Sequence, residues 1–482
     1  MRFKKQVIWG VAAVFVAIFA VSLSSLAVKS PLCTSSGSTA LCRVYHSVGF
    51  YKLAWKLKHW TRGGHSSSDK KRNVFSNPVL WMAPFLSGGG YCSEALSYVT
   101  GLHRSELVPY LSIEQHGDLA NELFWRGLPA ETKNTLLKSY RPGQPLNDTV
   151  VICHSEPGAW YPSLFETHTC PPTGYTEPLY VIGRTMFETD RVSAEHVRRC
   201  NLMDEIWVPT EFNMKTFADS GVYPSKLVKV FQSVDIDFFN SQKVQALTLP
   251  TGGRIFGAKN ANAVTEDYFI FLSIFKWEYR KGWDRLIEAY LTEFSANDKV
   301  ALYIVTNAYH SGRVYEDEIA AYVKRIGLKE PTGGWPILHV SDDHVPQSKL
   351  PSLYKAADAF VLASRGEGWG RPIVEAMSMA LPVIATNWSG MTEYMTKGNS
   401  YPLHVEGLVE VEEGPFKGHL WAEPSVAHLQ SLMRHITIHR AEAQGKGWIA
   451  RLTMVQRFSP DIVTQEIVDH LRRIRKERAA AT

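Results

Sequence analysis

The stretch Ser364–Glu375 reads SRGEGWGRPIVE and sets Glu367 and Glu375 eight positions apart around a glycine-proline turn. A proline at this point suits the start of a helix, and LPVIAT at residues 381–386 is typical of a buried parallel strand. Just upstream, LYKAADAFVLAS at residues 353–364 predicts the end of a helix followed by another buried strand. The two glutamates are therefore expected at the carboxyl end of a strand, where open parallel sheets bind their ligands.

This passage resembles the retaining glycosyltransferases of family 4, in which a glutamate, seven residues and a second glutamate lie in a phrase like EGWGRPIVEAM. Further stretches are similar to the same family: PFLSGGGYCSEA at 84–95, IGRTMFETD through DEIWV at 182–208, FLSIFKWEYRKGWDRLIEAY at 271–290 and VIATNWSGMTEY at 383–394. The resemblance covers roughly residues 75–480. It implies an α/β fold of the GT-B type, with two Rossmann-like domains facing each other across a cleft, and a hexosyltransferase activity.

The resemblance also implies roles for charged residues of the second half. Glu375 would accept hydrogen bonds from the donor ribose, and Glu367 from the sugar hydroxyls, because an ionised carboxylate can only accept. Lys276 and Lys281 would bind the diphosphate. Family members commonly carry an arginine at the first of these positions, and a lysine there lacks the planar fork. Arg280 is expected to be an exposed neighbour.

Backbone amides are expected to complete the donor site, because amides at a helix start bind anions. The residues expected to bind the donor are Glu375, Gly368, Trp369, Gly370, Arg371, Ser389, Gly390, Met391 and Thr392. The residues expected to be catalytic are Lys276, Lys281, Glu367 and His154. The donor would be GDP-mannose or a UDP-hexose, and no metal or other cofactor is expected.

In the first half, Gly88, Gly89 and Gly90 follow a predicted strand. Three glycines let the backbone approach a ligand closely, so this loop is expected to face the cleft, with tight packing of strand against helix as the alternative. His154 follows the predicted strand TVVIC, and the resemblance implies that it faces the transferred sugar; a structural role is the alternative.

Two segments leave other interpretations open. Arg184 and Glu188 lie together near the end of another predicted strand, and a structural ion pair is favoured slightly over a role in the site. Asp235 and Asp237 resemble the metal-binding aspartates of the other glycosyltransferase fold, which would make the enzyme metal-dependent. A carbohydrate-binding protein that kept the fold and lost the reaction is a further alternative.

Length and composition agree with a two-domain protein. At 482 residues, with 45% hydrophobic residues, the chain suits two domains plus extensions. A net charge of +5 is too small to indicate nucleic-acid binding, and no zinc-like or RNA-binding motif supports it. The expected parts are an anchor at 1–28, a stem at 29–73, an acceptor domain at 74–245, a donor-binding domain at 265–445 and a returning C-terminal helix at 446–482.

The amino terminus predicts a membrane anchor. Arg2, Lys4 and Lys5 precede Val7–Val28, an uncharged stretch long enough to cross a bilayer as a helix. The basic residues are expected to stay cytoplasmic, giving a single-pass type II protein of the Golgi or endoplasmic reticulum with a lumenal catalytic body. A cleaved signal peptide is the alternative.

Cysteines and glycosylation motifs fit such a lumenal chain. Six cysteines allow 15 pairings, so no connectivity is predicted, and Cys92 and Cys153 are interpreted as either paired or buried free thiols. Asn147 and Asn387 satisfy the glycosylation pattern, but only Asn147 is expected to be modified because Asn387 lies in the expected donor turn.

Overall fold

The computed structural model describes residues 74–143, 145–173, 177–249, 254–257, 267–306, 315–343 and 345–481. By its internal contacts the chain divides into Met1–Arg72 and Asn73–Thr482. The expected anchor and stem lie outside the described residues. In the part of the chain that is described, no helix has both the length and the apolar character needed to span a bilayer.

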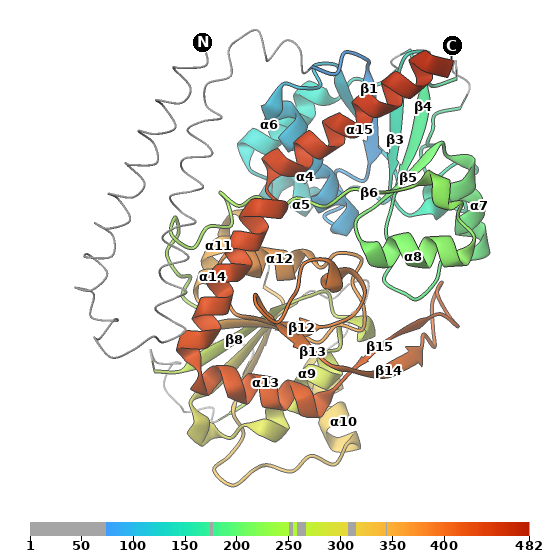
Figure 1. Ribbon diagram of the computed structural model, residues 1–482. Helices are drawn as coiled ribbons and strands as arrows, with labels where there is room; N and C mark the ends of the chain where they lie inside the picture. Colours follow the sequence, from blue (N-terminus) through green and yellow to red (C-terminus); the bar gives the residue numbers. More distant parts are fainter. Residues whose placement is uncertain are drawn as a thin grey trace, which may run out of the picture. The chain divides into compact units, whose positions relative to one another are not determined.

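A parallel sheet forms the centre of the first half (Figure 1). Its strands are short and rich in β-branched and aromatic residues, and β3 is buried at every position, as expected of strands covered on both faces. In sheet order the strands are β2 (Leu111–Gln115), β1 (Val79–Ala83), β3 (Val150–His154), β4 (Tyr180–Arg184), β5 (Glu205–Val208) and β6 (Leu227–Lys229). The helices are α4 (Gly90–Ser105), α5 (Glu122–Gly127), α6 (Ala130–Ser139), α7 (Ala194–Leu202) and α8 (Glu211–Ser220).

A second sheet, also parallel except at one edge, forms the centre of the second half. In sheet order its strands are β13 (Tyr401–Leu403), β12 (Val383–Thr386), β11 (Ala359–Leu362), β8 (Phe269–Ile274), β9 (Val300–Val305), β10 (Ile337–Ser341) and the antiparallel β7 (Arg254–Phe256). A hairpin of β14 (Val405–Glu410) and β15 (Leu420–Pro424) follows the sheet. The helices are α9 (Trp283–Glu293), α10 (Tyr315–Arg325), α11 (Leu350–Lys355), α12 (Arg371–Ser378) and α13 (Val426–Ile438).

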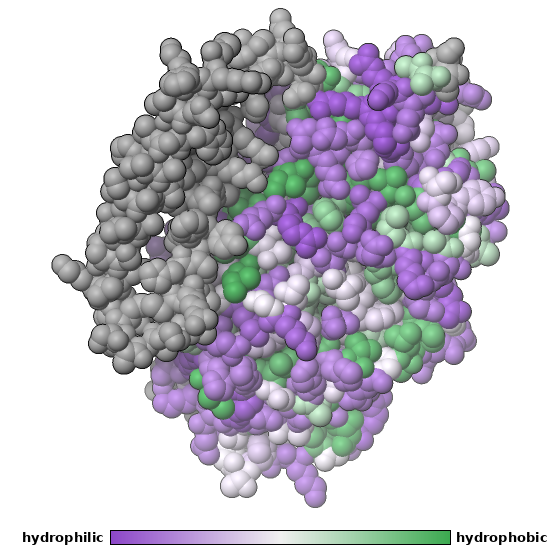
Figure 2. Space-filling model, in the orientation of Figure 1, coloured by the Kyte–Doolittle hydropathy of each residue, from purple (hydrophilic) through white to green (hydrophobic). Residues whose placement is uncertain are grey.

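Two helices occupy the segment expected to return to the first domain. Helix α14 (Arg440–Arg457) packs against α12 of the second half, whereas α15 (Pro460–Ala481) packs against α4 of the first. The returning helix therefore begins at Pro460. Its buried residues belong to the core of the first half and are Val463, Ile467, Val468, Leu471 and Ile474. The face of α15 shown in Figure 2 is mostly hydrophilic, as expected of an amphipathic surface helix.

The linker after β6 is held from both halves of the described chain. The Tyr98 hydroxyl of α4 donates to the Phe231 carbonyl at 2.7 Å, and Arg371 of α12 donates to the Ser233 carbonyl at 2.7 Å. The Val234 amide donates to the Phe458 carbonyl at 2.9 Å, just before α15 begins. These hydrogen bonds hold the two segments that connect the halves, the linker after β6 and the residues before α15, next to the loops that carry the expected site.

Candidate active site

Three loops of the second half bring most of the expected site residues to one sheet edge. The basic loop 275–282 follows β8, the loop 363–370 follows β11, and the turn 387–393 follows β12. These strands are neighbours in the order β12-β11-β8, and the pairs are parallel. Their carboxyl ends therefore lie side by side, where such sheets bind ligands.

An ion pair between Lys281 and Glu367 joins the basic loop 275–282 to the glutamate loop 363–370. The Lys281 Nζ donates to the two carboxylate oxygens of Glu367 at 2.7 and 2.9 Å, and the Ser364 hydroxyl donates to the same carboxylate at 2.8 Å. Burial alone would raise the pKa of Glu367, but Lys281 and Arg280 outweigh it and hold the pKa below its usual range. Glu367 is therefore ionised at neutral pH.

Arg280 belongs, with Lys281 and Ser364, to the Glu367 cluster, the group of side chains in contact with the Glu367 carboxylate. The prediction that Arg280 is exposed was therefore wrong. Its side chain is only 19% exposed, and Nη1 donates to the Gly366 carbonyl at 2.7 Å. The same nitrogen lies 3.4 Å from Oε1 of Glu188 and 3.5 Å from Oε2 of Glu367. Burial by itself would lower the pKa of Arg280, but these two carboxylates and Glu278 outweigh it, and the net pKa is raised. The guanidinium therefore stays charged. The 3₁₀ turn at Tyr279–Lys281, which loop sequence does not reveal, accompanies this inward position.

A glycine allows the basic loop to approach the end of β11. Gly282 has φ +65°, and a Cβ at this position would lie 1.8 Å from the Ala363 carbonyl oxygen. The Arg365 amide donates to the Arg280 carbonyl at 2.7 Å across the same contact. Residue 282 must therefore be glycine for Lys281 to reach Glu367.

Lys276, the other expected diphosphate ligand, stands directly after β8 and is influenced by charges from both halves. Burial lowers the pKa of Lys276, Glu278 offsets part of this, and the positive charge of Lys281 lowers it further. The carboxylate of Asp118, in the first half, acts on it in the opposite direction. The repulsion between the two lysines would be relieved by a bound dianion.

Glu375 lies on α12. The Tyr354 hydroxyl donates to Oε2 of Glu375 at 2.9 Å, and Arg371 Nε lies 3.9 Å from Oε1. Burial raises the pKa of Glu375, and Arg371 and Tyr354 offset only part of the rise. Its partners are thus Tyr354 and Arg371 rather than the two lysines, which separates it from the Glu367 cluster.

The glutamate loop 363–370 and the turn 387–393 after β12 are hydrogen-bonded to each other. The Glu367 amide donates to the Ser389 hydroxyl at 3.0 Å, and the Gly390 amide donates to the Glu367 carbonyl at 2.9 Å. The Gly390 amide was expected to face the diphosphate, but it is already hydrogen-bonded within the protein. The Trp369 indole is buried in the core against Tyr394 and Phe458. Only the backbone of Trp369 is therefore left to contact a bound nucleotide sugar. Gly368, Gly370, Met391 and Thr392 belong to the same loop and turn.

His154 lies inside the first half with both ring nitrogens engaged. The Trp81 indole donates to Nδ1 at 3.1 Å, so Nε2 carries the proton that faces Glu94 at 3.0 Å. The ring is completely buried, and burial lowers its pKa although Glu94 opposes this. Arg184 pairs with Glu94 as well, and not with Glu188 as expected. This is the contact pattern of a structural histidine.

The glycine loop of the first half stands at the start of α4. Gly88 has φ +75° and packs against Phe124, whereas a Cβ on Gly89 would lie 3.6 Å from the Asp118 carboxylate. A Cβ on Gly90 would meet no atom within 4 Å. The negative charge of Asp118 also raises the pKa of Lys276, and the position of the glycine loop at the cleft stays a prediction.

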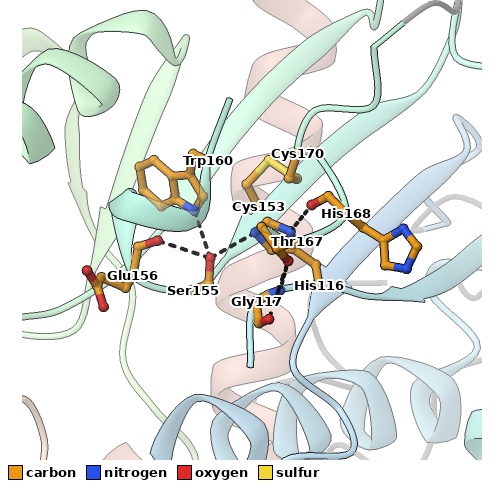
Figure 3. The surroundings of a disulfide bond; sticks show 9 residues. All are labelled: His116, Gly117, Cys153, Ser155, Glu156, Trp160, Thr167, His168 and Cys170. Atoms are coloured by element: carbon orange, nitrogen blue, oxygen red, sulfur yellow. Dashed lines mark hydrogen bonds between the residues drawn. A yellow bond between two sulfur atoms is a disulfide. The ribbon is translucent and has the colours of Figure 1, made fainter. Parts of the chain in front are cut away.

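The loop after β3 is tied down by a disulfide, which sequence reasoning left open (Figure 3). Cys153 bonds to Cys170, so of its two interpretations pairing is correct, while Cys92 and Cys200 are buried free thiols. His116 contacts the Ser155 hydroxyl at 3.0 Å and the His168 carbonyl at 2.6 Å. This loop is therefore fixed at the carboxyl end of β3.

Asp235 and Asp237, the residues of the metal-dependent alternative, make structural contacts. Asp235 accepts the amides of Asp237 and Phe238 at 3.1 and 3.0 Å, and Asp237 pairs with Lys243 at 2.7 Å. Within the described ranges, no group of three or more His, Cys, Asp or Glu residues is placed to hold a metal.

Comparison with known proteins identifies the second half. Residues 266–413 match the family of glycosyl transferases group 1. They form a group 1 glycosyltransferase domain. This domain contains Lys276, Arg280, Lys281, Glu367 and Glu375, so the clustered loops are its loops.

Curated relatives of the glycosyltransferase domain include mannosyltransferases. The O-antigen chain mannosyltransferase B of Escherichia coli is 40% identical over 81 residues, 17% of this chain and 20% of the relative. The lipopolysaccharide core biosynthesis mannosyltransferase LpsB of Rhizobium meliloti is 26% identical over 121 residues, 25% of this chain and 32% of the relative. The chain therefore spans less than a third of the length of each of these relatives.

Solved structures show that the fold extends over both halves. The Anabaena protein HepE, in complex with UDP and glucose, is similar with a TM-score of 0.54 and 14% identity, covering 82% of this chain and all of HepE. The sucrose-phosphate synthase of Thermosynechococcus elongatus gives a TM-score of 0.55 at 14% identity, covering 83% of this chain and all of the synthase. The expected α/β glycosyltransferase fold of the GT-B type is thus confirmed.

Proposed function

We propose that this protein transfers a hexose from a nucleoside-diphosphate sugar to a hydroxyl group of a glycan, glycoprotein or glycolipid, with retention of the anomeric configuration. The observation that carries the proposal is the contact of Lys281 with Glu367 at the carboxyl edge of the second sheet. It joins a cation suited to a diphosphate and a carboxylate suited to sugar hydroxyls inside the glycosyltransferase domain. The relatives that are mannosyltransferases support GDP-mannose as donor, and the UDP complex of HepE supports a UDP-hexose.

In the proposed reaction the bond between the anomeric carbon and the diphosphate oxygen breaks first. Lys281, Arg280 and Lys276 stabilise the negative charge that develops on the leaving diphosphate, while Glu367 accepts hydrogen bonds from the sugar. The acceptor hydroxyl then bonds to the oxocarbenium-like carbon on the face that the diphosphate leaves. Its proton passes to a diphosphate oxygen, so no protein base is required and atoms and charges balance.

The protein is further proposed to be a single-pass type II membrane protein of the Golgi or endoplasmic reticulum. Its support is the uncharged stretch Val7–Val28 behind three basic residues. The Cys153–Cys170 disulfide is consistent with an oxidising compartment.

A donor screen tests the proposed activity. The purified chain is incubated with UDP-glucose, UDP-galactose, UDP-N-acetylglucosamine and GDP-mannose, and released nucleoside diphosphate is measured with and without EDTA. Release from one donor that persists in EDTA and is lost in Glu367→Gln supports the proposal, and NMR of the first-formed sugar anomer reports retention. Release that requires added manganese would favour the metal-dependent alternative, and no release from any donor would favour a binding protein.

A further inference from the structure

The segment Met186–Glu188 of the first half lies directly on the glutamate loop of the glycosyltransferase domain. A Cβ on Gly366 would lie 2.4 Å from the Glu188 carbonyl oxygen, and a Cβ on Gly368 would lie 2.7 Å from the Met186 side chain. Neither glycine has a positive φ, so the space taken by this segment is what requires them. The glycines on either side of Glu367 thus seat a segment that the family match does not include.

This segment brings a carboxylate of the first half next to that of Glu367. Both distances from Arg280, 3.4 Å to Glu188 and 3.5 Å to Glu367, run from its Nη1 atom. The two carboxylate oxygens are therefore no farther apart than the sum of these distances. The Glu188 side chain is 31% exposed, against 8% for Glu367, so it retains surface for another partner.

The surroundings of Glu188 are polar and belong to the first half. The hydroxyl of Tyr91, one residue beyond the glycine loop, contacts the Thr185 hydroxyl at 3.1 Å and donates to the Met186 carbonyl at 3.0 Å. Burial raises the pKa of Tyr91, and the negative charges of Glu188 and Glu156 add to the rise. Glu188 thus lies where loops of the first half meet the Glu367 cluster.

We propose that Glu188 is an acceptor-binding residue that accepts a hydrogen bond from the attacking hydroxyl and orients it toward the anomeric carbon. The inference rests on the proposed function, which places the transferred sugar beside Glu367. An ionised carboxylate can only accept, so a hydroxyl group is its natural partner. Glu188 takes no proton in this role, because the acceptor proton goes to the departing diphosphate. Arg280 holds the carboxylate in place through Nη1.

Glu278 provides a matched control. Its carboxylate lies 3.2 Å from Arg280 Nη2, it is 26% exposed, and it belongs to the basic loop rather than to the first half. Glu188→Gln and Glu278→Gln therefore remove the same charge from the same arginine. Only the first removes a carboxylate presented by the first half.

The experiment uses the full chain, the donor that the screen identifies, and water as the attacking hydroxyl compound. We expect Glu188→Gln to lower kcat for nucleoside-diphosphate release at least about tenfold, with the donor KM and the Kd for UDP or GDP unchanged. Glu278→Gln should stay within about threefold of the wild type. Formate should restore part of the kcat of Glu188→Ala, since it supplies a carboxylate to the vacated space.

Other outcomes overturn the inference. Equal effects of the two glutamine variants would mean that Glu188 acts only through Arg280, and an unchanged kcat in Glu188→Gln would remove the role altogether. If Glu188→Gln does not fold by circular dichroism, Glu188→Ala also removes the carboxylate, and wild-type kcat in that variant would equally overturn the role. An inactive wild-type chain would instead overturn the proposed function.

Discussion

The Lys281 ammonium group contacts both carboxylate oxygens of Glu367, 86 positions away in the sequence. The contact is inside the protein, since the two side chains are 12% and 8% exposed. Each group neutralises the other, and Arg280 adds a second cation to the same carboxylate. A donor diphosphate would therefore compete with Glu367 for Lys281, which would couple donor binding to the position of the carboxylate that we propose to bind the sugar.

Replacing Lys281 with alanine should lower donor turnover by about 10² or more. Without the preorganised Lys281 ammonium, the charge on the leaving diphosphate is less stabilised. The magnitude is taken by analogy with the loss of one hydrogen-bond donor from an oxyanion hole. Steady-state release of nucleoside diphosphate measures the effect. Lys324→Ala, on the exposed side of α10, is the control and should retain full turnover. Unchanged turnover in Lys281→Ala would contradict the assigned role.

Gly282→Ala should unfold the protein more easily and abolish activity. Its Cβ would lie 1.8 Å from the Ala363 carbonyl, so the basic loop must move away from β11. Gly327→Ala is the matched control, because Gly327 has φ +69° and no atom within 4 Å of its Cβ position. The control should cost about 1–2 kcal/mol for its left-handed backbone alone. Urea denaturation should show a clearly larger loss for Gly282→Ala, and equal losses would show that the close approach is unimportant.

Removal of the Cys153–Cys170 disulfide should lower the free energy of unfolding by about 3 kcal/mol, because the bond closes a loop with a sequence separation of 17. The double variant Cys153→Ser/Cys170→Ser is compared with the wild type by urea denaturation. Peptide mapping without reductant should find the two cysteines linked and Cys92 and Cys200 as thiols. Ready alkylation of Cys153 in the unreduced native protein would contradict the pairing.

His116 should make the protein less stable in mild acid. Burial lowers its pKa to about 4, whereas an unfolded histidine has a pKa of about 6.5. Between these values the unfolded chain binds the extra proton, so the stabilising contribution is complete above pH 6.5 and is lost as the pH falls toward 4. About 2 kcal/mol of the loss between pH 7.5 and 5 should be absent in His116→Gln. Identical pH profiles for the two proteins would contradict this assignment.

Local sequence was sufficient for the features that depend on neighbours along the chain. The two glutamates around the glycine-proline turn predicted a strand end and a helix start, and both are present at β11 and α12. The diphosphate-binding role of Lys281 is what the resemblance to family 4 implies, and it stays a prediction. A returning helix was likewise predicted within residues 446–482, and α15 occupies Pro460–Ala481.

Contacts between distant segments could not be predicted in this way. Arg280 and Lys281 are adjacent and equally charged, and a loop sequence does not show that both face inward. Glu188 could pair with Arg184 by spacing, yet Arg184 reaches Glu94 and Glu188 reaches Arg280. His154 also looked suited to a site, but the Trp81 and Glu94 side chains that engage it come from β1 and α4.

The alternation of buried strands and helices, the position of Glu367 at a strand's carboxyl end and the positive charge of the loop after β8 could all be predicted locally. These features follow from periodicity and turn composition, which act over a few residues. The folded chain was needed to establish which charges meet, which cysteines pair and which half supplies Glu188. Those choices depend on the packing of segments far apart in the chain, where burial forces each charged group to find a partner.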